Sequence, residues 1–218
     1  MKPPPTLEIA ELFFSIQGES SYAGQPCVFI RLAGCNLHCT FCDARYANEE
    51  AAQQQTLDQI LAFVAAYPAF PVEITGGEPL LQEGVYPLLA ELLAAGRRVL
   101  LETNGSLPVD RVSAGVVKIV DVKCPDSGAG DSFDRENLRL LSPEDELKFV
   151  ISSRRDYDWA VDFLRTNLLP GNLIVHFSPV TTLLALGALA DWILADRLKV
   201  RLQLQLHKFL WPEALRGK

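Results

Sequence analysis

Apolar, β-branched segments alternate with helical patterns along this chain, and that alternation restricts its possible folds more than any other feature. We expect strands at residues 8–16, 28–32, 72–75, 98–102, 116–122, 147–151, 173–178 and 200–206. We expect helices at residues 57–67, 85–95, 157–167 and 183–195, with Thr56 as the N-cap of the first. Strand–helix–strand connections are right-handed and build a mostly parallel sheet, which predicts an α/β fold. Because the strong βα units are too few for a full barrel, the expected architecture is an incomplete TIM-like (β/α) barrel.

The length of 218 residues suits one core, and no linker or repeat divides the chain, so we expect a single domain over residues 1–218. No apolar run approaches the roughly 18–20 residues of a membrane span, and the start of the chain lacks a secretory signal pattern. We therefore expect a cytoplasmic protein without a membrane partner. The net charge is −7 and the basic residues are scattered, so nucleic acid is not expected as a direct partner.

Polar segments follow several predicted strands at the edge where a parallel sheet places its ligands. Thr-Gly-Gly-Glu-Pro occupies residues 75–79, Glu-Thr-Asn-Gly occupies 102–105, and Lys123 and Ser-Pro at 178–179 follow later strands. We expect these segments to meet in one site. The turn-forming segment 125–134 is expected as a loop beside that edge, either a lid or a plain surface loop.

Three of the five cysteines fall within eight residues, in a Cys-x3-Cys-x2-Cys motif formed by Cys35, Cys39 and Cys42. In a cytosolic chain this pattern indicates metal or redox chemistry rather than disulfides, and soft thiolates favour an iron–sulfur cluster or zinc. Three ligands would leave one iron of a 4Fe–4S cluster open to a chelating small molecule. The alternative is a structural zinc site, but its nearest fourth ligand, His38, lies inside the short loop and would be cramped.

The cysteine motif and Gly-Gly-Glu-Pro at residues 76–79 together resemble the radical S-adenosylmethionine (SAM) superfamily. Further segments are more specific, namely Ser-Ile-Gln-Gly-Glu at 15–19, Phe-Ile-Arg-Leu-Ala-Gly-Cys-Asn at 29–36 and Gln-Leu-His-Lys at 205–208. With these the chain resembles the 7-carboxy-7-deazaguanine synthase family over nearly its whole length.

The resemblance implies a carbon–nitrogen lyase of queuosine and 7-deazapurine biosynthesis, which belongs to a tRNA modification pathway. A 4Fe–4S cluster and S-adenosyl-L-methionine would yield a 5′-deoxyadenosyl radical that takes hydrogen from C6 of 6-carboxy-5,6,7,8-tetrahydropterin. The ring would then contract and lose ammonia to give 7-carboxy-7-deazaguanine. The resemblance also implies a reducing partner such as flavodoxin or ferredoxin, and a homodimer.

Site roles carry over from the family where its motifs match this sequence. The metal ligands would be Cys35, Cys39 and Cys42. The SAM contacts would be Phe41, Cys42, Asp43, Gly77, Asp121, Val122 and Lys123. The pterin contacts would be Ile16, Gln17, Gly18, Glu19, Arg31, Thr75, Glu78 and His207. The fork of Arg31 suits the substrate carboxylate, and no catalytic acid or base is assigned.

Several of these residues also have simpler interpretations. Arg31 could form an ordinary ion pair at a strand end, and Gln17 could belong only to a turn. His207 could be a hydrogen-bonded histidine within a strand-like run. Cys27 and Cys124 match no ligand position and are expected as small buried hydrophobic residues.

Position 44 departs from the family pattern. A Thr or Ser there commonly helps to hold a magnesium ion, whereas this chain has Ala44, which has no side-chain oxygen. Magnesium prefers octahedral oxygen coordination and readily keeps waters. We therefore expect Mg²⁺ either to bind with a water in place of the hydroxyl or to be absent.

Two other functions fit part of the pattern. A glycyl-radical activating enzyme shares the cysteine and Gly-Gly-Glu-Pro motifs but not Gln-Gly-Glu at 17–19 or the terminus around His207. A non-catalytic zinc-binding module would be colourless, whereas an anaerobically purified iron–sulfur protein is brown.

Overall fold

The computed structural model describes residues 5–214 and 216–217. Over these residues the strands are β1 (Thr6–Ile16), β2 (Pro26–Leu32), β3 (Gln53–Thr56), β4 (Val72–Gly76), β5 (Val99–Thr103), β6 (Val116–Asp121), β7 (Glu146–Ile151), β8 (Ile174–Pro179) and β9 (Arg201–Leu202). The α-helices are α1 (Tyr46–Glu49), α2 (Leu57–Ala65), α3 (Val85–Ala94), α4 (Arg154–Thr166), α5 (Leu186–Ala195) and α6 (Leu206–Leu210). Short 3₁₀ turns are η1 (Pro79–Leu81), η2 (Pro125–Ser127) and η3 (Arg135–Arg139).

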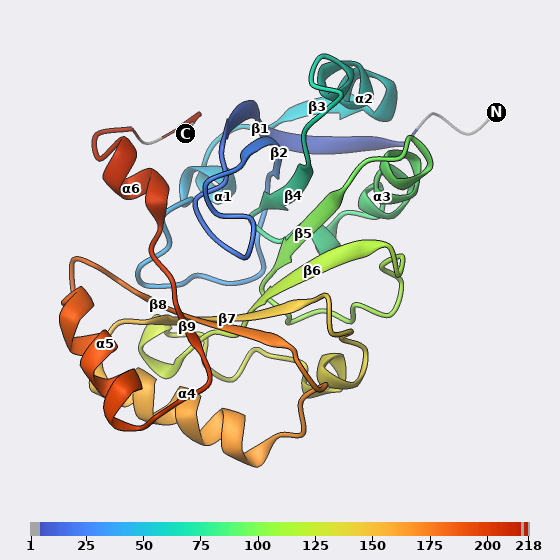
Figure 1. Cartoon of the computed structure of the whole chain (residues 1–218). Coiled ribbons are helices and arrows are strands. Elements are labelled where there is room, and N and C mark those ends of the chain that lie inside the picture. The colour runs from blue at the N-terminus through green and yellow to red at the C-terminus, as the bar shows by residue number, and fades with distance from the viewer. Residues whose placement is uncertain (1–4, 215, 218) are drawn as a thin grey trace.

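The described strands form one sheet in the order β3-β1-β2-β4-β5-β6-β7-β8-β9. Each neighbouring pair from β2 to β9 is parallel, whereas β1 is antiparallel to both β2 and β3. The sheet curves from β3 and β1 at the top of Figure 1 to β8 and β9 at the bottom, without closing into a ring. The predicted α/β architecture, an incomplete barrel with a mostly parallel sheet, is confirmed.

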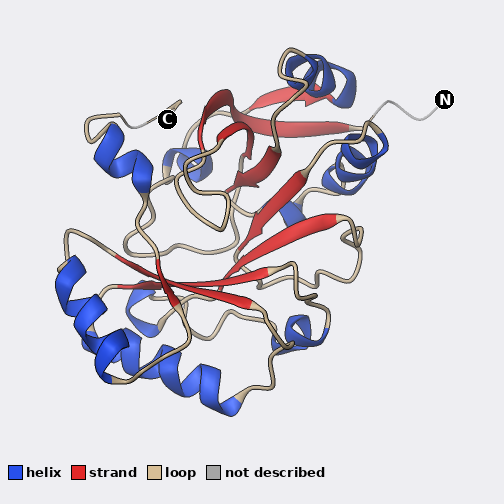
Figure 2. Cartoon of the chain, in the orientation of Figure 1, coloured by secondary structure: helices blue, strands red, loops and turns tan. Residues whose placement is uncertain are grey.

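The longer helices cover the outer, convex face of the sheet (Figure 2). One buried cluster joins the apolar residues of α2 and α3 to those of β1, β2, β4 and β5. A second joins α4 and α5 to β6, β7 and β8. Burial of these apolar faces is the main stabilising term of the fold, and it leaves the concave face for other groups.

The helix start signal at Thr56 acts as the sequence predicts, whereas α4 begins at Arg154, three residues before the expected start. Thr56 caps α2 by accepting the Gln59 N–H, and the Gln59 side chain accepts the Thr56 N–H in return, which is a capping box. Ser153 caps α4 in the same sense, because its hydroxyl accepts the Asp156 N–H.

The predicted strand at 200–206 is wrong beyond Leu202. Only Arg201 and Leu202 pair with β8, and the chain then leaves the sheet and turns into α6. The residues after Leu202 contact the turn after β1 instead of β8. There the Leu206 N–H donates to the Gly18 carbonyl. The short elements α1 and β3 are not predicted from the sequence, because both are only four residues long.

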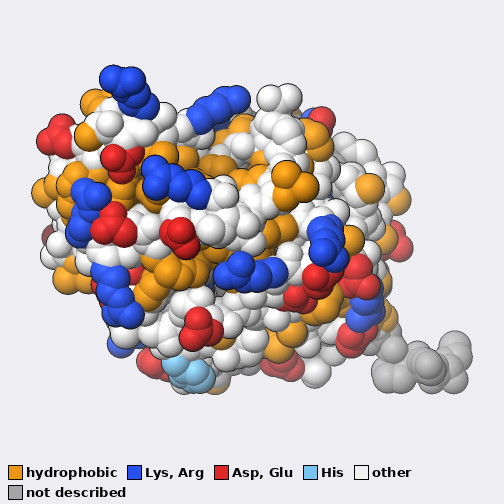
Figure 3. Space-filling model, turned by 90° about the horizontal axis from the view of Figure 1, so that it is seen from below, with side chains coloured by type: hydrophobic (Ala, Val, Ile, Leu, Met, Phe, Trp, Pro, Cys, Tyr) orange, Lys and Arg blue, Asp and Glu red, His pale blue; other side chains and the backbone are white. Residues whose placement is uncertain are grey.

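None of the helices in residues 5–214 and 216–217 is long and apolar enough to cross a membrane. Seen from below, the face that carries α4 and α5 shows basic and acidic side chains interspersed with hydrophobic ones (Figure 3).

Candidate active site

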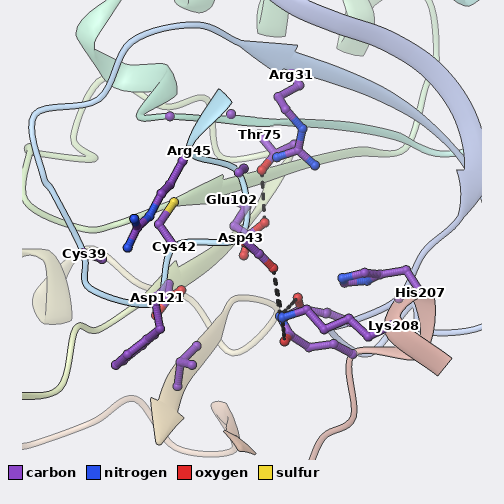
Figure 4. A pocket seen from close by; sticks show the side chains of 18 of the residues that line it. Arg31, Cys39, Cys42, Asp43, Arg45, Thr75, Glu102, Asp121, His207 and Lys208 are labelled. Atoms are coloured by element: carbon purple, nitrogen blue, oxygen red, sulfur yellow. Dashed lines mark hydrogen bonds and ion pairs between the residues drawn. The ribbon is translucent and has the colours of Figure 1, made fainter. Parts of the chain in front are cut away.

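A cavity of about 740 Å³ lies on the concave side of the sheet, at the carboxyl ends of the parallel strands. Its walls come from the turn after β1, the loop between β2 and α1, the ends of β4, β5 and β6, and the residues around α6. Figure 4 shows Cys39 and Cys42 on one side of this cavity, His207 and Lys208 on the other, and Asp43 between them. The polar segments at 75–77 and 102–104 therefore meet with Lys123, as expected, whereas Ser178 and Pro179 are buried and are not among the residues that line the cavity.

The loop between β2 and α1, residues 33–45, is called the cysteine loop here because it carries three free thiols, Cys35, Cys39 and Cys42. The Cys35 N–H donates to the side-chain oxygen of Asn48 at 2.9 Å. Thr40 fixes the middle of the loop, since its N–H donates to the Ser127 carbonyl and its hydroxyl to the Asp126 carbonyl, both at 2.9 Å. Segment 125–134 thus braces the cysteine loop from outside. None of its residues is among those that line the cavity, so its interpretation as a lid is not supported.

Asn104, just beyond β5, joins its strand end to the cysteine loop. Its side-chain amide donates to Asn36 Oδ1 at 3.1 Å and to Cys35 Sγ at 3.9 Å. Amide donors beside a sulfur ligand stabilise thiolate charge and orient the ligand. Burial raises the pKa of the Cys39 thiol, while Lys123 acts in the opposite direction.

Two glycines allow the end of β4 to lie directly against the base of the cysteine loop. A Cβ on Gly77 would stand 1.9 Å from the Gly34 carbonyl oxygen and 3.0 Å from the Cys35 Cβ. Gly76 has φ +147°, and its Cβ would stand 2.2 Å from the Leu32 oxygen. Only glycine permits this approach, which leaves a bare backbone edge beside a ligand cysteine.

Lys148 is the central cation of the cavity floor. Its ammonium group is 2.6 Å from Glu19 Oε2, 2.6 Å from Glu102 Oε1 and 3.6 Å from Asp121 Oδ2, with a side chain only 4% exposed. Burial alone would lower the pKa of Lys148, but these carboxylates raise it well above its ordinary value. For Glu102, burial alone would raise the pKa. Lys148 and the Thr75 hydroxyl, which donates to Glu102 at 3.1 Å, instead hold the pKa of Glu102 below its ordinary value.

A second group of charges lies between the cysteine loop and α6. Asp43, whose side chain is half exposed to the cavity, is 3.3 Å from the Lys208 ammonium group. Desolvation would raise the pKa of Asp43, but Lys208, Lys148 and Arg31 hold it well below its usual range.

Lys123 lies 2.8 Å from Asp121 Oδ2, and Asp121 Oδ1 is buried without a hydrogen-bond partner among the described residues.

Arg31, near the end of β2, presents an incompletely satisfied guanidinium to the cavity. Its carbon lies 5.8 Å from the ring centre of Phe13 and 5.9 Å from that of Tyr46, and Phe13 stacks on Phe29 at 4.7 Å. Its Nε is buried and has no hydrogen-bond partner within the described residues. An ordinary ion pair at a strand end is therefore not what holds this side chain. The arrangement suits an anionic ligand such as a carboxylate.

The turn after β1 and helix α6 are built onto each other. A Cβ on Gly18 would stand 2.4 Å from His207 Nδ1 and 3.2 Å from its backbone nitrogen. Gln205 Nε2 donates to Glu19 Oε1 at 2.7 Å. Burial lowers the pKa of His207, although Glu19 and Asp43 act in the opposite direction, which favours a neutral imidazole. The predicted strand environment of His207 is wrong, because it lies in α6.

Most residues predicted for the site line this one cavity. They are Ile16, Gln17, Gly18, Glu19, Arg31, Cys35, Cys39, Phe41, Cys42, Asp43, Thr75, Gly77, Asp121, Lys123 and His207. Cys27 and Cys124 are buried in the fold, as expected.

Two predicted contacts are not in the cavity wall. Val122 is completely buried and packs in the core formed with α4 and α5, so its side chain points away from the site. Glu78 is also completely buried, and it accepts hydrogen bonds from the Thr103 hydroxyl at 2.8 Å and the Asn104 N–H at 2.8 Å. Glu78 therefore joins the loops after β4 and β5 and is not placed to contact a substrate.

Glu73 and Lys148 also line the cavity, and neither is among the site residues expected from the sequence. Each interrupts an apolar strand, in Val72-Glu73-Ile74 and Leu147-Lys148-Phe149. A charge inside an otherwise apolar strand is costly unless it has a partner or a function, and that signal could have found both.

The donor set fits an iron–sulfur cluster better than a single ion. Within the described part of the chain no group of three or more His, Cys, Asp or Glu side chains is arranged to hold one metal ion. A structural zinc would need four such ligands around it, whereas a 4Fe–4S cluster takes one thiolate per iron. For magnesium, Ala44 has no side-chain oxygen, so an ion bound there would need a water in place of the hydroxyl.

The chain is similar to several known proteins. The family model for the Radical SAM superfamily matches residues 29–166. The chain is 47% identical to a 7-carboxy-7-deazaguanine synthase of Koribacter versatilis over 226 aligned positions, which cover 97% of this chain and 100% of the relative. It is 48% identical to the synthase of Chlorobaculum tepidum, with 97% of each chain covered. A crystal structure of QueE from Escherichia coli has a TM-score of 0.75 at 24% identity, and the match covers 91% of this chain and 94% of that one.

Proposed function

The chain belongs to the 7-carboxy-7-deazaguanine synthase family of the radical SAM superfamily, and from this we propose that it converts 6-carboxy-5,6,7,8-tetrahydropterin to 7-carboxy-7-deazaguanine with loss of ammonia. The observation that carries the proposal is that one cavity contains both three free thiols and a guanidinium whose buried Nε has no hydrogen-bond partner among the described residues. These are the groups needed for a cluster and for a carboxylate-bearing substrate. When bound, the 4Fe–4S cluster and SAM supply a 5′-deoxyadenosyl radical that abstracts hydrogen from C6.

We assign Cys35, Cys39 and Cys42 to the cluster, with the Leu37 N–H at 3.4 Å and the Asn104 amide at 3.9 Å as donors to Cys35 Sγ. The bare backbone of Gly77 would receive the amino group of SAM, since no side chain obstructs it. The remaining SAM contacts are assigned to side chains that line the same wall, namely Phe41, Asp43, Asp121 and Lys123.

We assign the pterin to the deeper part of the cavity, between β2 and α6. Arg31 would bind the substrate carboxylate through its fork, and the aromatic rings beside it would exclude water from that ion pair. The turn at Ile16, Gln17 and Gly18 would present its edge to the pterin. His207 would close the site from α6, which is packed on Gly18. Thr75 and Glu19 would complete the pocket as members of the Lys148 network.

Four further parts of the proposal concern the domain organisation, the partners and magnesium. We propose one domain over the whole chain, because a single sheet runs from residue 6 to residue 202. A homodimer and a flavodoxin-like or ferredoxin-like electron donor follow from family resemblance. No step is assigned to Mg²⁺, because Ala44 removes the side-chain oxygen that would hold it.

Mass spectrometry of a reduced, cluster-loaded reaction with SAM and the carboxytetrahydropterin tests the function. We expect 7-carboxy-7-deazaguanine and ammonia, with and without added Mg²⁺. Because substrate and products contain the same atoms, the abstracted hydrogen must be returned, so 5′-deoxyadenosine should not accumulate in step with the product. Deoxyadenosine without any pterin product would instead indicate an activase of a glycyl-radical enzyme. A colourless protein that takes up zinc but no iron or sulfide would refute the radical SAM chemistry altogether.

A further inference from the structure

The cavity contains one buried carboxyl group to which the assignments above give no role. Glu73 lies within β4, is only 3% exposed, and its Oε2 accepts a hydrogen bond from the Gln17 side-chain amide. The neighbouring cavity carboxylates Glu102 and Asp121 each contact a lysine, but no ion pair is recorded for Glu73 within the described part of the chain. A buried carboxyl without a cation is costly to keep, which indicates a role toward a ligand.

The sheet register places Glu73 below the guanidinium that we assign to the substrate carboxylate. Arg31 is directly opposite Thr75, and Glu73 is two residues earlier on the same strand and faces the same side. Glu73 therefore lies roughly 6.6 Å further toward the amino ends of the strands. This offset relates backbone positions, and it places Glu73 deeper than Arg31 on the same face of the sheet. A pterin held by Arg31 at one end would bring its aminopyrimidinone ring to Glu73.

We propose that Glu73 is the specificity-determining residue for the pterin ring, and that it accepts hydrogen bonds from the N3–H and the 2-amino group. This inference rests on the proposed function, because it takes the carboxytetrahydropterin as the substrate. The two N–H donors are adjacent and parallel, and an ionised carboxylate offers two acceptor oxygens in the matching arrangement.

The surroundings of Glu73 fix the orientation that this contact requires. The Gln17 side chain donates to Glu73 with its nitrogen and accepts the Glu19 N–H with its oxygen at 3.0 Å, so the amide cannot rotate without losing both bonds. No recorded hydrogen bond from a described residue reaches Glu73 Oε1. Pre-positioned acceptors of this kind reduce the ordering cost of binding.

Binding should also release a proton from Glu73. Burial, then Glu102 on β5 and Glu19 on the turn after β1, raise the pKa of Glu73 well above its ordinary value, and Lys148 on β7 and Arg31 on β2 oppose them. Two N–H donors from the ligand stabilise the ionised carboxylate and so lower that pKa in the complex. Pterin affinity of the unmodified enzyme should therefore increase with pH, and a variant without the carboxyl should lose this dependence.

The test compares the tetrahydropterin with 6-carboxy-5,6,7,8-tetrahydrolumazine, in which an oxo group replaces the 2-amino group. Dissociation constants are measured by anaerobic calorimetry at pH 8 on cluster-loaded, SAM-bound enzyme without reductant, so that no turnover is needed. We expect unmodified enzyme to prefer the pterin by about 10- to 150-fold, as for loss of a hydrogen bond to a charged group. In Glu73→Gln the preference should disappear or reverse, because the amide oxygen can accept N3–H while its NH2 group can donate to a 2-oxo group but not to a 2-amino group.

Glu73→Asp is the second variant, because it keeps the acid but shortens its reach, and it should also lose most of the preference. Glu146→Gln is the matched control: Glu146 is a buried strand carboxylate that bonds His176 Nε2 at 2.7 Å and is not among the cavity residues. Glu146→Gln should prefer the tetrahydropterin over the tetrahydrolumazine by the same factor as the unmodified enzyme. If Glu73→Gln and Glu73→Asp retain the full preference, the inference is wrong. Failure of the unmodified enzyme to form 7-carboxy-7-deazaguanine would instead refute the proposed function.

Discussion

Replacing Lys148 by methionine should remove more stability than any other single change in the cavity floor. Its ammonium group is 2.6 Å from both Glu19 and Glu102, and each contact is worth about 6 kcal/mol of Coulomb energy at an effective dielectric of about 20, before desolvation. Methionine fills a similar volume but leaves two carboxylates in a buried site without their cation. Removal of one partner of a buried pair costs about 3–5 kcal/mol, so we expect that loss in Lys148→Met.

Anaerobic urea denaturation of the cofactor-free chain at pH 7.5 measures this loss without a contribution from ligand binding. Lys148→Met should also lower the melting temperature by roughly 6–20 °C. A second variant, Lys148→Met with Glu102→Gln, should recover part of the stability, because it also removes one of the uncompensated charges. The reasoning fails if Lys148→Met lies within about 1 kcal/mol of the unmodified chain, or if Glu102→Gln worsens the loss.

The pH dependence of this effect has a definite sign. Lys148 holds the folded-state pKa of Glu102 below its ordinary value, so the stabilisation is present above that ordinary value and is lost as the pH falls through the lowered one. In Lys148→Met, the stabilisation that comes from the lowered pKa of Glu102 is absent at neutral pH. The stability difference between the two chains should therefore narrow as the pH falls below about 4.3, where carboxylates begin to protonate.

Three further changes test the geometry of the site. Gly77→Ala should reduce the cluster content, measured by iron and sulfide analysis, because its Cβ would stand 1.9 Å from a backbone oxygen of the cysteine loop. Gly187→Ala is the control. It has open space at its Cβ and should leave the cluster content unchanged. Gly18→Ala should raise KM for the pterin more than it lowers kcat, because it displaces His207 and with it α6; an unchanged KM would contradict the packing. Arg31→Lys should lower kcat/KM by roughly 10–100-fold, because a point charge replaces a bidentate fork, while uncoupled deoxyadenosine formation continues.

The local sequence predicts most of the fold because short-range signals and tertiary packing agree. Thr56 and Gln59 are a readable capping box, and the apolar runs at β2, β4 and β6 are long enough to indicate buried strands. The end of the chain could not be predicted in this way. Its leucines at 202, 204 and 206 alternate as in a strand, but β9 has only one neighbour, and contacts with the turn at Gly18 take the chain out of the sheet.

The sequence predicts the candidate-site residues that belong to a motif. It does not predict those whose place in the cavity depends on the curvature of the sheet. The cysteines lie in one motif, and Gly77 lies in a second motif that also specifies its own geometry. Glu78 belongs to the same motif, but its position within it does not reveal that its carboxylate faces two buried donors. The inward direction of Glu73 and Lys148 depends on which face of the sheet is concave, and no local pattern in those strands contains that information.

The polar floor has a cost that the fold must offset elsewhere. Salt bridges among buried groups rarely stabilise a protein more than apolar packing would, so the Lys148 network is poor evidence for stability as its purpose. Apolar packing lies instead on the convex face, in the two clusters beneath α2, α3, α4 and α5. With stability supplied there, fixed charges can remain on the concave face at distances of 2.6 Å, oriented before any ligand arrives. Such preorganisation favours a charged cofactor and an anionic substrate because the protein dipoles need not reorganise on binding.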